Sequence, residues 1–278
     1  MRRLLDASAN YQLHSTEKWF FLAALVGIFA GAGGIVFQIL VQTIQHFVLA
    51  QATGLEPIGA ANAHPLFPRV DGHVAPGAVV AVMALGGLVS GLLVHIWAPE
   101  AGGPGANAVI DSFHNQRGEV RAPVPLIKAL ASAITLGTGG SAGREGPIAQ
   151  ICAGLASILA NRLRLSAHDR RILLVMGMGA GVGAVFRAPL AAALFAGEIL
   201  YSDADLETDV VVPCAVSSAV AYCVYGLWLP DSLHAPFWRR RISSCLSLGT
   251  VAVHSHGLGS RRGGRAVHQD VYRIAELV

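Results

Sequence analysis

Residues Gly137–Asn161, GTGGSAGREGPIAQICAGLASILAN, place an arginine and a glutamate inside apolar sequence, with one glycine between the glutamate and a proline. Proline suits the start of a helix, because its missing N–H would have no partner there. The apolar run from Pro147 to Ala160 predicts a helix about 22 Å long, since each helical residue adds about 1.5 Å. Because a bilayer's hydrocarbon layer is about 30 Å thick, Glu145 is expected at membrane depth, where an ionisable group indicates a functional site.

The composition of the chain indicates a membrane protein. Charged residues make up 13% of the chain and hydrophobic residues 53%, whereas soluble domains contain about 25% charged residues. Five stretches carry few or no charges: Trp19–Leu55, Val74–Pro99, Ala122–Ala160, Ile172–Gly197 and Val210–Pro230. A soluble protein could bury one such stretch, but five would leave too little polar surface. The sequence therefore predicts an all-α, polytopic protein of the cell membrane, with the lipid bilayer as a partner.

Two apolar segments are long enough to cross a bilayer, and later ones are short and broken by glycine and proline. The long segments are Trp19–Ala50, which would be strongly tilted, and Pro76–Trp97. The later segments are Val109–Phe113, Val124–Leu136, Pro147–Ala160, Ile172–Ala184, Pro189–Leu200 and Val210–Leu229. Short helices are tolerated in hydrocarbon only where they line a cavity or pack against protein, and broken helices are typical of transporters.

Three glycine-rich clusters stand at the starts of apolar segments: Gly102–Asn107, Gly139–Pro147 and Gly177–Pro189. Helix N-termini present unpaired N–H groups and about half a positive charge, and glycine lets the backbone approach an ion. Several such ends that converge in a water-poor cavity would form an anion site.

Glu145 would lie at the mouth of this site. Its carboxylate would occupy the position of the anion until it is protonated, so that conduction would depend on pH. The alternative hypothesis is that Arg144 and Glu145 neutralise each other in a structural loop.

These motifs resemble the CLC family of chloride channels and chloride/proton antiporters. Residues 140–147, GSAGREGP, are similar to the family's GREGP signature, and Phe186–Glu198 is similar to its FxAPLxGxLFxxE segment. Residues 103–107 occupy the place of its GSGIP loop, and the resemblance covers about Trp19 to Leu229. It implies that Glu145 is a gating glutamate and that the full-length protein is a homodimer with one pore per subunit. The implied anion-binding residues are Gly103, Pro104, Gly105, Gly143, Arg144, Gly146 and Pro147.

Two residues depart from the family's pattern. Members that prefer chloride usually have serine, whose hydroxyl binds the ion, where this chain has Pro104. Proline has neither a hydroxyl nor an N–H, so both chloride and nitrate remain candidates. Antiporters often have a second glutamate after the one that matches Glu198, and this chain has Ile199 there. We therefore expect a passive channel in preference to a proton-coupled antiporter, which stays as the alternative.

The resemblance covers only the first of the two inverted halves of the family's membrane unit. The GxFxP motif of the second half is not found, and Tyr222 and Tyr225 come too early to replace its ion-contacting tyrosine. We interpret the chain as a fragment that lacks one wall of the anion site and could be inactive alone. The expected parts are a lead at 1–18, a CLC-like membrane domain at 19–236, and a basic tail at 237–278 that is disordered or non-native.

The basic residues before the first apolar segment, Arg2, Arg3 and Lys18, favour a cytoplasmic N-terminus. The cysteines form no CxxC pair, and His254 and His256 have no further ligands nearby in the sequence. We therefore expect neither a metal site nor another cofactor, and no nucleic-acid partner.

Two enzyme classes fit poorly. An intramembrane serine protease would need a GxSG turn, which Gly139–Ala142 lacks, and nothing brings His95 to Ser141. A phosphate-binding loop would need a Lys-Ser or Lys-Thr pair after Gly137–Gly139, and none follows. The chain is therefore expected not to be an enzyme. A non-conducting structural membrane subunit remains an alternative, although it does not explain the position of Glu145.

Overall fold

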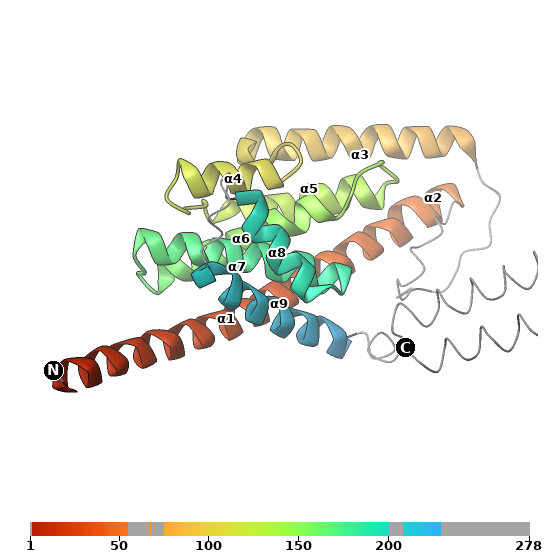
Figure 1. Ribbon diagram of the computed structural model, residues 1–278. Coiled ribbons are helices and arrows are strands. Elements are labelled where there is room, and N and C mark those ends of the chain that lie inside the picture. The colour runs from red at the N-terminus through yellow and green to blue at the C-terminus, as the bar shows by residue number, and fades with distance from the viewer. Residues whose placement is uncertain (1, 55–66, 68–74, 201–207, 229–278) are drawn as a thin grey trace, which may run out of the picture. The chain divides into compact units, whose positions relative to one another are not determined.

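The computed structural model describes residues 2–54, 67, 75–200 and 208–228, and all the regular structure in them is helical. The helices are α1 (Arg2–Ile44), a π-helical turn (Gln45–Ala50), α2 (Gln51–Thr53), α3 (Pro76–Trp97), a 3₁₀ turn (Pro99–Ala101), α4 (Ala106–His114), α5 (Pro123–Gly137), α6 (Glu145–Arg162), α7 (Ala167–Phe186), α8 (Pro189–Leu200) and α9 (Thr208–Trp228). The predicted all-α fold is thus confirmed for these residues (Figure 1). The basic tail expected at 237–278 lies outside them.

The predicted apolar segments correspond to helices in the structure. α3 and α8 begin and end at the predicted residues, Pro76–Trp97 and Pro189–Leu200. α6 begins at Glu145, earlier than predicted, so that Pro147 lies inside its first turn. Proline is tolerated there because the first N–H groups of a helix have no partner within the helix.

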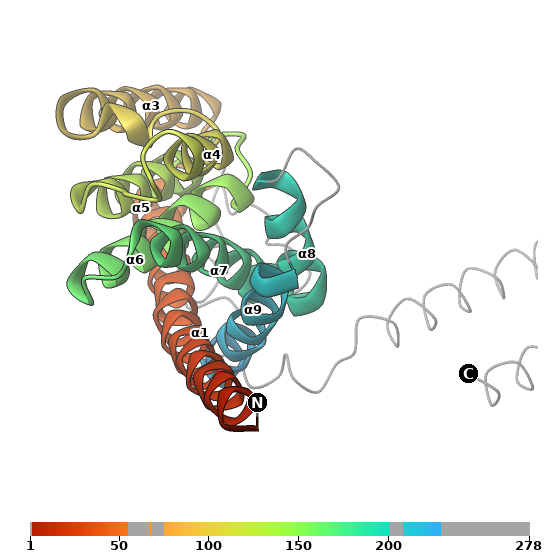
Figure 2. The ribbon, with the colours of Figure 1, turned by 60° about the vertical axis from the view of Figure 1, so that its left-hand side comes forward.

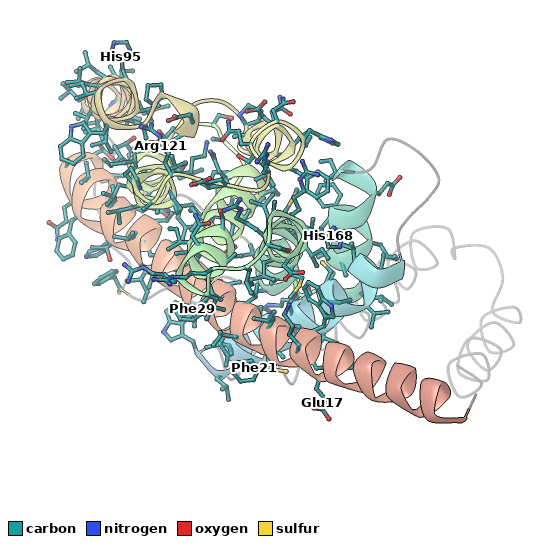
Figure 3. All side chains as sticks on the ribbon, turned by 90° about the vertical axis from the view of Figure 1, so that its left-hand side faces the viewer. Glu17, Phe21, Phe29, His95, Arg121 and His168 are labelled. Carbon is teal, nitrogen blue, oxygen red and sulfur yellow. The ribbon has the colours of Figure 1, made fainter. Side chains whose placement is uncertain are left out.

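In the described part of the chain, three helices are long and apolar enough to cross a membrane: Glu17–Thr53, Pro76–Trp97 and Val210–Trp228. The span in α3 packs mainly against α5 and lies at one edge of the helices (Figures 1 and 2). Large apolar side chains remain exposed on it, including Leu88 and Trp97. On α1, Phe21 and Phe29 are also exposed and point away from the neighbouring helices (Figure 3). In a lipid environment these apolar side chains would contact acyl chains, so their exposure would not carry the free-energy cost of contact with water.

α7 forms the centre of the helical packing. It contacts α1, α6, α8 and α9, and residues 172–184 are all buried. A Cβ atom added at Gly181 would lie 2.6 Å from Cys152 Sγ on α6, so this glycine allows the two helices to approach closely. Gly183 makes a similar approach to the Ser218 hydroxyl on α9. Small residues at such contacts are typical of packed membrane helices.

This packing corrects one expectation from the sequence. The third glycine-rich cluster, Gly177–Pro189, was expected to provide a helix start that faces an ion. Instead, its glycines lie inside the buried helix α7 and serve contacts between helices. Sequence alone could not separate the two roles, because both require a residue without a side chain.

We predict that Gly181→Ala lowers the free energy of unfolding by about 1–3 kcal/mol, because an added methyl group overpacks the contact with Cys152. Gly87→Ala is the matched control, since a Cβ atom at Gly87 would have no neighbour within 4 Å. Thermal unfolding in detergent, followed by circular dichroism, measures both changes. Equal midpoints for the two variants would contradict the close packing of α6 on α7.

Candidate functional site

A pocket of about 640 Å³ opens beside the N-terminus of α6. Its lining comes from four segments: the end of α3, residues 99 and 101–104, one face of α5, and residues 142, 143 and 145–147. The first two glycine-rich clusters of the sequence therefore meet at one place. Among the predicted site residues, Gly103, Pro104, Gly143, Glu145, Gly146 and Pro147 line this pocket.

The loop at residues 103–105 lies directly against the first turn of α6. A Cβ atom at Gly105 would lie 2.3 Å from the Gly146 carbonyl oxygen, and one at Gly146 would lie 1.8 Å from the Pro104 carbonyl oxygen. Gly105 also has a φ of 85°, which a residue with a side chain rarely adopts, and it is the residue before α4. The N-terminus of α4 therefore adjoins that of α6, whose first turn lines the pocket, although Gly105 and α4 are not part of the lining themselves. Each N-terminus contributes N–H groups and a partial positive charge.

Glu145 is the first residue of α6, and its side chain folds back over Gly143. A Cβ atom at Gly143 would lie 2.0 Å from Glu145 Oε2, so the missing side chain of Gly143 provides the space that the carboxylate occupies. The Glu145 side chain is exposed in the described chain, although we expected it to be enclosed at membrane depth. The difference arises because the pocket is open on one side, where the described residues provide no wall.

Arg144 lies apart from the other predicted site residues. Its guanidinium donates a hydrogen bond of 2.9 Å to Gln38 Oε1 on α1, and Arg144 is not part of the pocket lining. Within the described residues, no ion pair joins Arg144 to Glu145. The alternative in which these two charges neutralise each other is therefore not what the structure contains.

Lys128 is a pocket residue that our sequence analysis did not single out. It lies on α5 with only 4% of its surface exposed, and its Nζ donates hydrogen bonds of 2.8 Å to the carbonyl oxygens of Ala101 and Gly103. No carboxylate of the described residues lies within ion-pair distance of it. Its positive charge is thus held at the pocket wall by carbonyl groups. The sequence did contain a signal, since Lys128 is the one lysine in the apolar stretch Ala122–Ala160.

We predict that Lys128→Met destabilises the loop at residues 101–105. The loss of the ammonium group leaves the buried Ala101 carbonyl oxygen and the partly buried Gly103 carbonyl oxygen without their donor. An unsatisfied buried group costs about 1–3 kcal/mol, and a partly buried one costs less because water can replace the donor. Hydrogen–deuterium exchange should become faster at residues 101–105 and remain unchanged in the core of α7. Lys128→Arg, which keeps a cationic donor, is the control. Unchanged exchange in the Met variant would show that Lys128 does not hold the loop.

Comparison with known proteins identifies the family. A family model described as "Voltage gated chloride channel" matches residues 86–253, of which 201–207 and 229–253 lie outside the described structure. The chain belongs to this family, as the CLC-like motifs predicted.

Two curated relatives illustrate the similarity. A "Chloride/fluoride channel protein" of Pseudomonas syringae pv. tomato is 30% identical over 214 residues, which are 76% of this chain and 41% of that protein. An "H(+)/Cl(-) exchange transporter ClcA" of Salmonella schwarzengrund is 33% identical over 176 residues, which are 63% of this chain and 34% of that protein. The chain therefore spans less than half the length of these relatives.

Two solved structures have a similar fold. A slow cyanobacterial Cl−/H+ antiporter superposes with a TM-score of 0.58 and 22% identity, covering 75% of this chain and 46% of that one. A CLC-type fluoride/proton antiporter superposes with a TM-score of 0.60 and 22% identity, covering 78% and 48%. The predicted CLC-like helical architecture is confirmed by this likeness.

Proposed function

We propose that this chain forms one part of a CLC-type pathway for chloride, or another small inorganic anion such as nitrate, across the cell membrane. The observation that best supports this function is the meeting of two helix N-termini at the backbone contact between Gly105 and Gly146. A third positive contribution comes from Lys128, which lines the same pocket. The protein acts as a transporter and not as an enzyme.

The pocket would hold an anion mainly by dipoles. N–H groups at helix starts attract an anion without a directly bound countercharge. The ammonium group of Lys128 already donates to two carbonyl oxygens. It therefore attracts the anion mainly from a distance and does not form a tight ion pair with it. An anion held in this way can still leave, as transport requires. The proposal includes anion-binding roles for Gly103, Pro104, Gly105, Gly143, Gly146 and Pro147. Because the Arg144 guanidinium is bonded to Gln38, Arg144 would contribute through its backbone and not through its side chain.

Glu145 is the proposed gate. Its carboxylate is an anion next to a helix start, and it has no ion-pair partner among the described residues. It therefore competes with the transported anion for the same positive potential. Protonation removes the competing charge, so anion binding and conduction should increase as pH falls.

The transport mode is proposed to be passive. Ile199 follows Glu198 where many antiporters have a second glutamate, and an isoleucine side chain cannot relay a proton. A proton-coupled antiporter is the second candidate, supported by the relatives and solved structures whose names describe exchange with protons. Homodimerisation of the full-length protein and a cytoplasmic N-terminus belong to the same proposal.

We predict that Glu145→Gln strengthens chloride binding at pH 7.5 by at least about tenfold. Two unit charges about 4 Å apart repel by about 4 kcal/mol at an effective dielectric constant of about 20, so removal of the carboxylate charge removes a strong competitor. Isothermal titration of the purified chain in detergent, at pH 7.5 and pH 5, measures the effect. The affinity should be higher in Glu145→Gln than in wild type at pH 7.5, and it should change less with pH in Glu145→Gln than in wild type.

Glu119→Gln is the matched control, because Glu119 carries the same charge but does not line the pocket. Identical pH profiles for wild type and Glu145→Gln would remove Glu145 as the gate. Chloride efflux from liposomes, with this chain reconstituted alone and together with the second half of a CLC relative, tests the pathway itself. No efflux in either case would favour the non-conducting structural subunit.

A further inference from the structure

One face of α5 lines the pocket with polar groups. The lining includes Lys128, Ala131, Ser132 and Thr135. The last three residues follow Lys128 by three, four and seven positions, so all of them lie along one side of the helix. The hydroxyl groups of this region differ in whether they are already engaged. The Ser90 hydroxyl donates to the Ala131 carbonyl oxygen at 2.9 Å, and the Thr135 hydroxyl lies 2.8 Å from the Ser90 hydroxyl.

Ser132 is the hydroxyl of this face that remains without a partner. It is half-buried, and no hydrogen bond joins its side chain to any residue in the described part of the chain. A serine inside a helix often donates to the carbonyl group four residues earlier. Because Ser132 does not, its hydroxyl can donate to a molecule in the pocket.

The surroundings of Ser132 favour an anion as that molecule. Ser132 lies one helical turn from Lys128, which is bonded to the Gly103 carbonyl oxygen, next to Pro104 in the chain. Pro104 lines the same pocket but has neither a hydroxyl nor an N–H to offer. The ammonium group and the two helix starts repel a cation and attract an anion. The pocket thus has no hydroxyl donor at Pro104, whereas the hydroxyl group of Ser132 on α5 is free to donate.

We propose that the Ser132 hydroxyl donates a hydrogen bond to the transported anion and thereby supplies the ligand that Pro104 cannot provide. This inference rests on the proposed anion pathway and names one of its specificity-determining residues. The hydroxyl favours chloride over nitrate, because the charge of chloride is concentrated on one atom, whereas that of nitrate is spread over three oxygen atoms. A single donor therefore stabilises chloride more strongly.

The test compares Ser132→Ala with wild type, each also in the Glu145→Gln background, where the carboxylate no longer competes. Isothermal titration of the purified full chain in detergent with sodium chloride and with sodium nitrate gives the two affinities. Loss of a hydrogen bond to a charged group should weaken chloride binding by about tenfold or more, and nitrate binding by less. Ser132→Thr, which keeps the hydroxyl, should retain the wild-type ratio of the two affinities.

Ser166→Ala controls for the loss of a hydroxyl elsewhere, since Ser166 caps α7 by accepting from the Asp169 N–H and does not line the pocket. Equal affinities and an unchanged chloride-to-nitrate ratio in Ser132→Ala would overturn the role of Ser132 and leave the pathway intact. A parallel loss for both anions would indicate a structural effect and would also overturn it. If neither wild type nor Glu145→Gln binds either anion, the proposed function itself fails.

Discussion

The contact between the backbone at residues 103–105 and the first turn of α6 is the constraint on which the rest of the site depends. No side chain fits at Gly105 or Gly146, because a Cβ atom would lie within 2.3 Å of a carbonyl oxygen at either position. Glycine is therefore required on both sides of the contact. As a result, the starts of α4 and α6 lie close together, which side chains between them would prevent, and the proposed anion site relies on this closeness.

Buried donors hold this contact in place from two neighbouring helices. Gln150 on α6 donates to the Glu100 carbonyl oxygen at 2.9 Å. Lys128 on α5 donates to the carbonyl oxygens of Ala101 and Gly103 in the same segment. α6 is itself fixed by its close packing on α7, which Gly181 permits. The pocket is thus a product of helix packing, because side chains of α5 and α6 hold the segment that forms one of its walls.

Much of this fold could be predicted from the sequence, and part of the site could not. The apolar segments predicted the helices because runs of apolar residues bounded by glycine and proline leave few other structures in a membrane. The GREGP and GGPG motifs indicated two segments whose residues meet at the pocket, and their contact with an ion stays a prediction. By contrast, Gln38 as the partner of Arg144 and the carbonyl groups around Lys128 are contacts between segments far apart in the chain. No local pattern encodes such contacts.

The two charges at the pocket differ in their freedom to move, and the proposed gating depends on this difference. Lys128 is buried and bound to two carbonyl oxygens, so its charge is fixed in the wall. Glu145 lies above a glycine in an open pocket, and within the described residues it has no ion pair that would have to be broken before it moves. A fixed positive potential with a movable negative group can exchange that group for a free anion. Had Arg144 been paired with Glu145 instead of Gln38, displacement of the carboxylate would also have to break an ion pair, and the proposed exchange with a free anion would be less favourable.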